Sequence, residues 1–181
     1  MIFKETSLKG SYVLALEPIE DERGWFARTY CKNEFLAIGH TKEWVQMNHS
    51  FTKQKGTIRG MHYQRAPFSE IKLVRCIAGS VYDVIIDLRT DSDSYLQYFG
   101  IELSASNHKM IYIPEGFAHG FQALSNDVEL IYHHSQFYLP GVEAAVKYNE
   151  PAIKINWPLE LSSISERDNS YPFIDANFKG L

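Results

Sequence analysis

The chain has few cysteines and no long apolar segment, and both absences narrow its class. Two cysteines, Cys31 and Cys76, are too few for a disulfide framework in 181 residues. We therefore expect a reducing, cytoplasmic setting. No run approaches the ~18 apolar residues of a membrane span, and the N-terminus has no apolar signal core. The sequence thus predicts a protein that does not enter a membrane.

An excess of positive charge is also absent. The formal net charge is −4 at pH 7, so the chain has no general electrostatic reason to bind nucleic acid or an anionic membrane. A phosphate group on a substrate would have to be met by local Arg and Lys side chains. Hydrophobic residues make up 45% of the chain, which is enough for the core of a single domain over residues 1–181.

Helix signals are scarce, whereas strand signals recur along the chain. Asn33 is the predicted N-cap of a short helix over residues 34–38 that stops at Gly39, and a helical turn is expected near residues 162–168. Short strands at near-regular spacing indicate a sandwich or barrel rather than βαβ units. We predict an all-β jelly roll with short peripheral helices. Its strands are expected at residues 12–16, 25–30, 44–50, 57–64, 71–77, 80–88, 98–103, 109–113, 119–124 and 128–138.

Residues 56–73 concentrate side chains that bind anions, titrate or carry charge. Arg59, His62 and Lys72 all lie in this stretch. A flat strand would point Arg59 and His62 to opposite faces, unless Gly60 marks a bulge that re-aims one of them. Lys72 alternates with Val74 on a strand, so it could face inward. Each side chain alone also has an ordinary structural alternative, as a satisfied histidine or a solvated cation.

A metal site is one hypothesis for these histidines. Metal-binding cupin barrels place histidines in a pattern like G-x5-H-x-H and another in P-x-G-x-x-H. Gly56 and His62 fit the first pattern, but Gln64 occupies its second histidine position, and His119 fits the other pattern. A catalytic zinc or iron site needs about three protein ligands. The spacing therefore supports the barrel but not a metal, and we expect neither a metal nor another cofactor.

Proton transfer is the alternative chemistry for two histidines in a barrel mouth. Neutral imidazole accepts a proton near its pKa of ~6.5, and a carboxylate behind it fixes its tautomer. Asp83, Asp87 and Asp168 are candidates for that carboxylate, and the sequence does not choose among them. Lys72 could stabilise an enolate as it forms.

A tyrosine on a later strand could supply the acid. Period-two alternation places Leu130, Tyr132, His134, Gln136 and Tyr138 on one face of that strand. A phenol keeps its proton at neutral pH, which suits a general acid, and a second aromatic ring could stack on a base. The structural alternative is that these tyrosines are core aromatics with satisfied hydroxyl groups.

Several blocks, in this order, resemble the dTDP-4-dehydrorhamnose 3,5-epimerase family of cupin-fold sugar-nucleotide enzymes. The two most specific are R-G-M-H-Y-Q at residues 59–64 and P-E-G-F-A-H-G-F at residues 114–121. Further matching blocks bring the resemblance to nearly the whole chain. They include residues 21–26, 46–50, 72–75, 83–84, 87–89, 157–158 and 164–168, with Tyr132 and Tyr138.

The resemblance implies a metal-free isomerase that inverts C3, C5 or both in an NDP-4-keto-6-deoxyhexose for rhamnose-type deoxysugar biosynthesis. It implies that His62 is the base, Asp168 its carboxylate partner, Lys72 the group that stabilises the enolate, and Tyr132 the acid. Substrate contacts are implied for Arg23, Phe26, Gln46, Asn48, Arg59, His119 and Tyr138.

The resemblance also implies a homodimer in which N-terminal strands, within residues 1–50, cross to the partner, so that Arg23 and Phe26 serve the neighbouring site. The C-terminal tail, residues 150–181, is expected to pack on the barrel.

Some residues depart from the family pattern. Arg28 stands where the family usually has Glu, and Met47 where it has Asp, so the sequence leaves the nucleotide base open. Glu70 replaces a common Gln, the pair at residues 133–134 is His-His rather than Lys or Arg with Cys, and Arg167 replaces Lys. Alternatives are a single-centre epimerase or a 3,4-ketoisomerase on another sugar nucleotide, a non-catalytic sugar-binding cupin, and, more distantly, a metal-dependent oxygenase.

Overall fold

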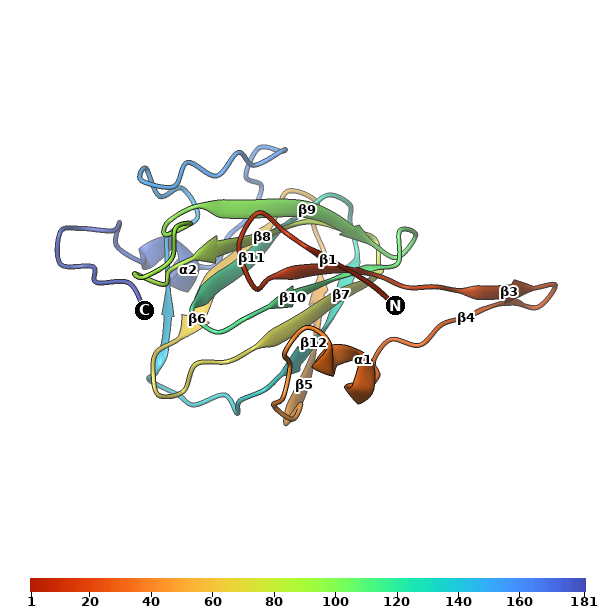
Figure 1. Ribbon diagram of the computed structural model, residues 1–181. Coiled ribbons are helices and arrows are strands. Elements are labelled where there is room, and N and C mark those ends of the chain that lie inside the picture. The colour runs from red at the N-terminus through yellow and green to blue at the C-terminus, as the bar shows by residue number, and fades with distance from the viewer.

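Two antiparallel sheets form the body of the protein in the computed structural model, which describes residues 1–181 (Figure 1). The six-stranded sheet has the order β1 (Ile2–Glu5), β2 (Tyr12–Ala15), β10 (Lys109–Ile113), β7 (Lys72–Ala78), β12 (Val128–His134) and β5 (Gln46–Thr52). The five-stranded sheet has the order β13 (Glu143–Ala145), β6 (Ile58–Gln64), β11 (Phe117–Ala123), β8 (Ser80–Asp87) and β9 (Tyr98–Ser104). The predicted all-β jelly roll is confirmed.

The main core lies between the two sheets. Val74 and Leu130 from the six-stranded sheet meet Val81, Ile85 and Phe121 from the five-stranded sheet, all nearly inaccessible to solvent. These side chains alternate along their strands with outward-facing ones, as a pleated strand requires. Burial of each large apolar side chain contributes roughly 1.5–3 kcal/mol, so this layer holds the sheets together.

The C-terminal tail covers the outer face of the five-stranded sheet. Trp157, Ile174 and Phe178 pack there against Met61 and Val84. Because β8 is thereby buried on both faces, its sequence reads as an almost continuous apolar run. The tail contains no strand at the alternating residues 153–157 and a single short helix, α2 (Glu166–Ser170).

Helix α1 (Lys32–Leu36) lies on the outer face of the six-stranded sheet, where Phe35 is fully buried. The prediction that Asn33 is its N-cap is wrong. The N-cap is Cys31, whose side chain makes no capping hydrogen bond, and Asn33 lies inside the first turn. Neither helix is long and apolar enough to cross a membrane.

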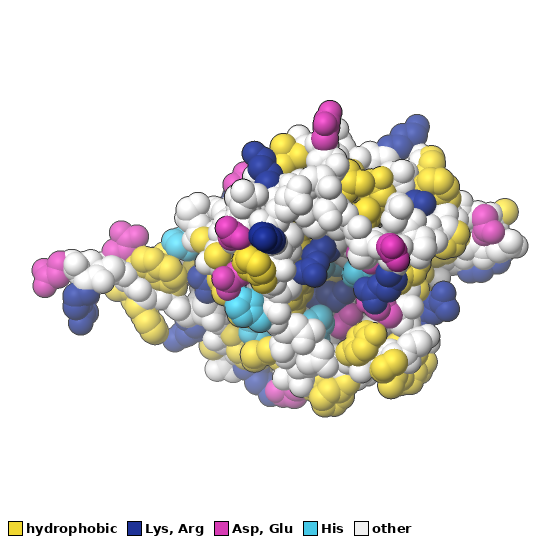
Figure 2. All heavy atoms as spheres, turned by 180° about the vertical axis from the view of Figure 1, so that it is seen from behind, with side chains coloured by type: hydrophobic (Ala, Val, Ile, Leu, Met, Phe, Trp, Pro, Cys, Tyr) yellow, Lys and Arg dark blue, Asp and Glu magenta, His cyan; other side chains and the backbone are white.

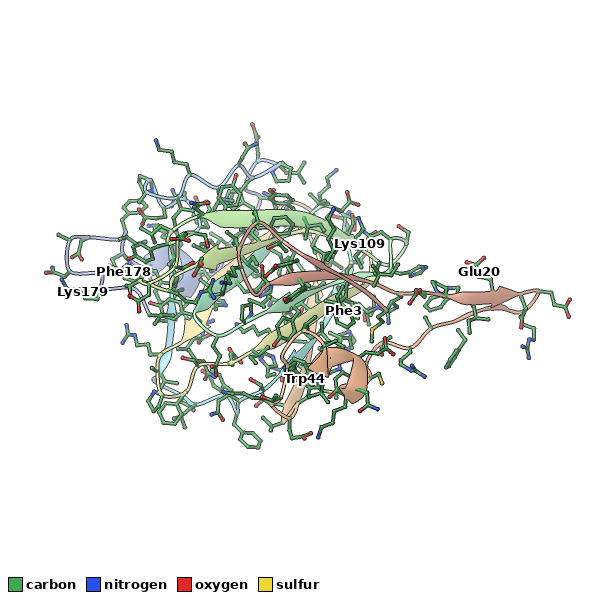
Figure 3. All side chains as sticks on the ribbon, viewed as in Figure 1. Phe3, Glu20, Trp44, Lys109, Phe178 and Lys179 are labelled. Atoms are coloured by element: carbon green, nitrogen blue, oxygen red, sulfur yellow. The ribbon has the colours of Figure 1, made fainter.

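A two-stranded hairpin stands away from the body. It consists of β3 (Ile19–Asp21) and β4 (Gly24–Phe26), so the strand predicted over residues 25–30 is mostly loop. Figure 3 shows Glu20 on this hairpin at the opposite end of the molecule from Phe178 and Lys179. Ile19 is 74% exposed and Phe26 is 73% exposed. The hairpin therefore presents apolar side chains to solvent far from the sheet core.

Strand β12 ends earlier than the sequence predicted. It stops at His134, so Gln136 and Tyr138 lie in a loop rather than on the strand face. Two glutamines hold this loop. The Tyr138 N–H donates to Gln46 Oε1 at 3.1 Å, and the Leu139 N–H donates to Gln64 Oε1 at 3.2 Å.

The bulge at Gly60, which the sequence left as an open alternative, is present. His119 on β11 pairs with His62, whereas Phe121, two residues on, pairs with Arg59, three residues back. The extra residue in β6 changes the direction of the side chains on either side of it. Gly60 has φ of +132°, and a Cβ there would lie 2.5 Å from Gly120 Cα.

Replacing Gly60 by alanine is expected to lower the free energy of unfolding by about 3 kcal/mol, because strain at positive φ adds to a backbone clash. Gly24 is a matched control, with φ of +125° but nothing within 4 Å of an added Cβ. Gly24→Ala should cost only about 1 kcal/mol of strain. Urea unfolding of both variants measures the difference, and equal losses would contradict a clash at Gly60.

Candidate active site

A single large cavity opens between β5 and β12 on one side and β6 and β11 on the other, with the segment before α2 at its rim. Its volume is about 680 Å³. Figure 2 shows a hollow with basic, acidic and histidine side chains gathered around it. All the predicted site residues except Arg23 and Phe26 line the cavity: Gln46, Asn48, Arg59, His62, Lys72, His119, Tyr132, Tyr138 and Asp168.

His62 is paired with a carboxylate from the far end of the chain. Its Nε2 lies 2.8 Å from Asp168 Oδ1, and the side chain of Asp168 is only 5% exposed. A carboxylate that is ionised can only accept, so the hydrogen is on Nε2 and Nδ1 is left free to take a proton.

The charge on Asp168 is maintained despite its burial. Burial raises the pKa of the Asp168 carboxyl, but the hydrogen bond from His62 and the N–H of Gly60 together bring this pKa below its usual value. The pair therefore stabilises the fold above the unfolded pKa of about 3.9, and this stabilisation is lost as the pH falls through the lower folded pKa.

Local structure explains how Asp168 reaches His62. The Ile58 N–H donates to the Ser163 carbonyl at 2.9 Å, which ties the segment before α2 to the start of β6. Ser165 then caps α2, its hydroxyl accepting the Asp168 N–H at 3.0 Å. The Gly60 N–H donates to the second carboxylate oxygen at 3.3 Å.

A second histidine–aspartate pair lies directly beside the first. His119 is opposite His62 in the ladder between β11 and β6. Its Nε2 lies 3.1 and 2.9 Å from the two carboxylate oxygens of Asp83, and both side chains are buried. The third candidate, Asp87, instead pairs with Arg89 at 2.7 Å. The structure therefore selects Asp168 for His62 and assigns Asp83 to His119.

Tyr132 extends into the cavity from the facing sheet. Its hydroxyl lies 3.2 Å from Ser50 Oγ, and its ring packs edge-on against His119 with centroids 6.2 Å apart. Burial raises the pKa of the Tyr132 hydroxyl well above its usual value, an effect that the Ser50 hydrogen bond only partly offsets. The phenol is therefore protonated at neutral pH and can donate.

Lys72 faces inward, as the alternation on its strand allowed. It is 8% exposed, and its Nζ lies 3.4 Å from the His62 carbonyl and 3.2 Å from Glu70 Oε1. A fixed cation next to the histidine pairs is placed where it can stabilise negative charge on a bound molecule.

Arg59 differs from the other arginine in this cavity because it has no acidic partner. Its Nη1 lies 3.4 Å from the Phe51 carbonyl and 3.5 Å from Thr52 Oγ1, both weak contacts. Arg167, by contrast, is paired with Glu143 at 2.8 Å. The Arg59 guanidinium is thus available for an anionic group such as a phosphate.

Arg23 and Phe26 do not reach this cavity. Both lie on the β3–β4 hairpin, where Arg23 pairs only with Asp21. Sequence reasoning also missed Ser50, the partner of Tyr132. The sequence does contain a signal for Ser50, because Gln46, Asn48 and Ser50 form a polar period-two pattern on one face of β5.

Three or more His, Cys, Asp or Glu side chains arranged to hold a metal ion do not occur in the chain. Gln64 stands at the second histidine position of the cupin metal pattern, and it binds backbone carbonyl groups instead. Its Nε2 donates to the carbonyls of Phe68 at 3.2 Å and Phe137 at 3.3 Å, which fixes the loop before Tyr138.

Comparison with known proteins identifies the family to which this chain belongs. The family model described as dTDP-4-dehydrorhamnose 3,5-epimerase matches residues 5–176. The chain belongs to this family. The predicted family and enzyme class are therefore confirmed, and the enzyme is an isomerase acting as a sugar-nucleotide epimerase.

Relatives in this family match the present chain over nearly its full length. The dTDP-4-dehydrorhamnose 3,5-epimerase of Shigella flexneri is 41% identical over 170 residues, covering 92% of this chain and 93% of that enzyme. The crystal structure of the Bacillus anthracis enzyme with TDP and PPi bound has a TM-score of 0.92 at 35% identity and covers 96% of this chain and 99% of that chain. The Legionella pneumophila enzyme in complex with dTDP-4-keto-L-rhamnose has a TM-score of 0.91 at 34% identity, with 98% and 96% covered.

Proposed function

We propose that this epimerase acts on a dTDP-linked 4-keto-6-deoxyhexose of the 4-dehydro-6-deoxyglucose type, with His62 as the base and Tyr132 as the acid. The observation that carries this proposal is the placement of the two groups. His62 lies on β6 of one sheet and Tyr132 on β12 of the facing sheet, and both line the same cavity. Inversion of a carbon centre needs a proton acceptor on one face and a donor on the other.

The reaction begins at the carbon next to the C4 ketone. Free Nδ1 of His62 takes the proton from that carbon, and Asp168 stabilises the resulting imidazolium. The electron pair moves onto the ketone oxygen as an enolate. Such a C–H group is a weak acid, so the ammonium of Lys72 stabilises the enolate oxygen. The Tyr132 hydroxyl then delivers a proton to the opposite face of the carbon, and the C4 ketone is restored.

The rest of the substrate occupies the remaining part of the cavity. Arg59, which has no acidic partner, binds the diphosphate, while Gln46, Asn48 and the half-exposed ring of Tyr138 contact the nucleoside. His119, held by Asp83, lies beside His62 and contacts the sugar. Both cysteines are free, which fits the reducing cytoplasm predicted from the sequence.

The function is tested by incubating the purified protein with 4-keto-6-deoxyhexoses linked to dTDP, GDP, CDP and UDP. NMR of the products should show an inverted centre with the dTDP sugar and an unchanged C4 ketone. Movement of the carbonyl would indicate a 3,4-ketoisomerase instead. No conversion of any of these sugars would contradict the proposal.

A homodimer completes the proposed site. The hairpin that carries Arg23 and Phe26 projects from the body and exposes apolar side chains, as a segment that docks on a second copy would. We propose that these two residues contribute to the partner's cavity, Arg23 at the phosphates and Phe26 at the base.

Complementation between two inactive variants tests this arrangement. Arg23→Ala and His62→Asn are each expected to be nearly inactive as homodimers. A heterodimer, purified with two different tags, has one cavity with both native residues and should regain about half the wild-type rate per dimer. If Arg23 instead served its own cavity, the heterodimer would contain no complete site and would stay inactive.

A further inference from the structure

A buried carboxylate that the proposed reaction does not use lies next to Lys72. Glu70 Oε1 is 3.2 Å from Lys72 Nζ, and Glu70 Oε2 is 2.6 Å from His134 Nδ1. All three side chains are 10% exposed and line the cavity. Burial of charged groups costs free energy, and pairing recovers little of it. A gain in stability therefore does not explain this cluster.

The hydrogen bonds of the cluster have a single consistent direction. Asn48 Nδ2 donates to His134 Nε2 at 3.2 Å, and its own Oδ1 accepts from Gln46 Nε2 at 3.2 Å. His134 therefore carries its hydrogen on Nδ1, which it donates to Glu70. The chain of contacts runs from the amides on β5 to the ammonium of Lys72.

Glu70 is ionised in this environment. Burial raises the pKa of its carboxyl, but the hydrogen bond from His134 and the positive charge of Lys72 together bring this pKa below its usual value. A carboxylate held 3.2 Å from the Lys72 ammonium restricts the rotation of this flexible side chain. His134 fixes the carboxylate in turn, and its ring lies parallel to that of Tyr132 with centroids 6.1 Å apart.

We propose that Glu70 and His134 are positioning residues that hold the Lys72 ammonium in place and aimed at the substrate ketone, an inference that rests on the proposed function. Neither residue touches the reacting atoms. Glu70 acts through Lys72, and His134 acts through Glu70. The other titratable or charged groups that line the same cavity are Arg59, His62, Tyr63, His119, Tyr132, Tyr138, Glu143, Arg167 and Asp168.

Glu70→Gln tests the proposal, because it keeps the shape and removes the charge. We expect kcat at pH 7 to fall about tenfold with KM changed less than about twofold. Without the carboxylate the Lys72 ammonium is no longer held at the ketone, so kcat falls while substrate binding is kept. A purely structural role would leave the kcat of the folded variant unchanged.

Two variants of His134 test the role of this residue separately from that of Glu70. His134→Asn places an amide N–H near the former Nδ1, so kcat should stay within about threefold of wild type. His134→Leu removes the donor and should lower kcat about as much as Glu70→Gln. The matched control is Glu129→Gln. Glu129 on β12 pairs with His49 on β5 at 2.7 Å, on the exposed face of the sheet, so kcat and KM of this variant should be those of the native enzyme.

Labelling of Lys72 gives a readout that does not depend on turnover. An amine-reactive ester at pH 8.5 reacts faster with an amine released from its carboxylate partner, so Glu70→Gln should label Lys72 about tenfold faster by mass spectrometry, and Glu129→Gln should not. Unchanged labelling and an unchanged kcat in folded Glu70→Gln would overturn the positioning role. Faster labelling in a protein that converts no sugar would support the effect of Glu70 on Lys72 and contradict only the proposed function.

Discussion

Replacing His62 by asparagine is expected to lower the rate of proton exchange at the carbons beside the ketone about a thousand-fold, within the usual range for loss of a general base. Asparagine keeps a polar group near the former Nδ1, but its amide cannot take a proton. That loss corresponds to about 4 kcal/mol of transition-state stabilisation. Substrate contacts lie elsewhere in the cavity, so KM should change less than about threefold.

The measurement is deuterium uptake from D2O into the substrate, followed by NMR at fixed enzyme concentration. His49→Asn is the matched control, because His49 also pairs with a carboxylate, Glu129 at 2.7 Å, but lies on the exposed face of β5. It should keep the wild-type rate. A His62→Asn variant that retained more than about a tenth of the exchange would show that another group is the base.

Removal of the Tyr132 hydroxyl is expected to slow inversion of the carbon centre far more than proton exchange at that carbon. In Tyr132→Phe, His62 can still form the enolate and return deuterium to the face from which it took the proton. Exchange should therefore stay within about tenfold of the wild-type rate, while formation of the inverted sugar falls at least about a hundred-fold. Both expectations follow because Tyr132 acts only as the proton donor on the face opposite His62.

Tyr112→Phe is the control for this variant. Tyr112 is a buried tyrosine of the same sheet, and burial raises the pKa of its hydroxyl to about 12, yet its ring lies in the cluster on the outer face. Its loss should change neither exchange nor inversion. Wild-type inversion by Tyr132→Phe would remove Tyr132 as the acid, and equal loss of exchange and inversion would show that enolate formation also needs the phenol.

The repeating strands could be predicted because the signal is local. Residues 109–113 form β10 as predicted, and β8 differs from its prediction by one residue. The end of β12 could not be predicted in the same way. Residues 135–138 contain no Gly or Pro that would end a strand, but the chain leaves the sheet because Gln46 and Gln64 bind its backbone N–H groups from other elements. Those contacts depend on the folded arrangement.

The carboxylate partner of His62 also could not be predicted from the sequence. Asp83, Asp87 and Asp168 were equivalent candidates on spacing and residue type. The choice depends on the strand register, which pairs Asp83 with Phe121 and so places its side chain diagonally across from His119, and on the cap at Ser165, which places Asp168. The Gly60 bulge could be predicted as a condition, since a flat β6 would have separated Arg59 from His62.

The most direct test of the two-sided mechanism is the native enzyme's reaction with the dTDP-linked 4-keto-6-deoxyhexose in D2O, with no metal added. NMR of the product should show deuterium at every inverted centre, protium at the ring positions not next to the ketone, and the carbonyl still at C4. Inversion without deuterium at the inverted carbon would contradict proton removal by His62 and return from the facing sheet by Tyr132.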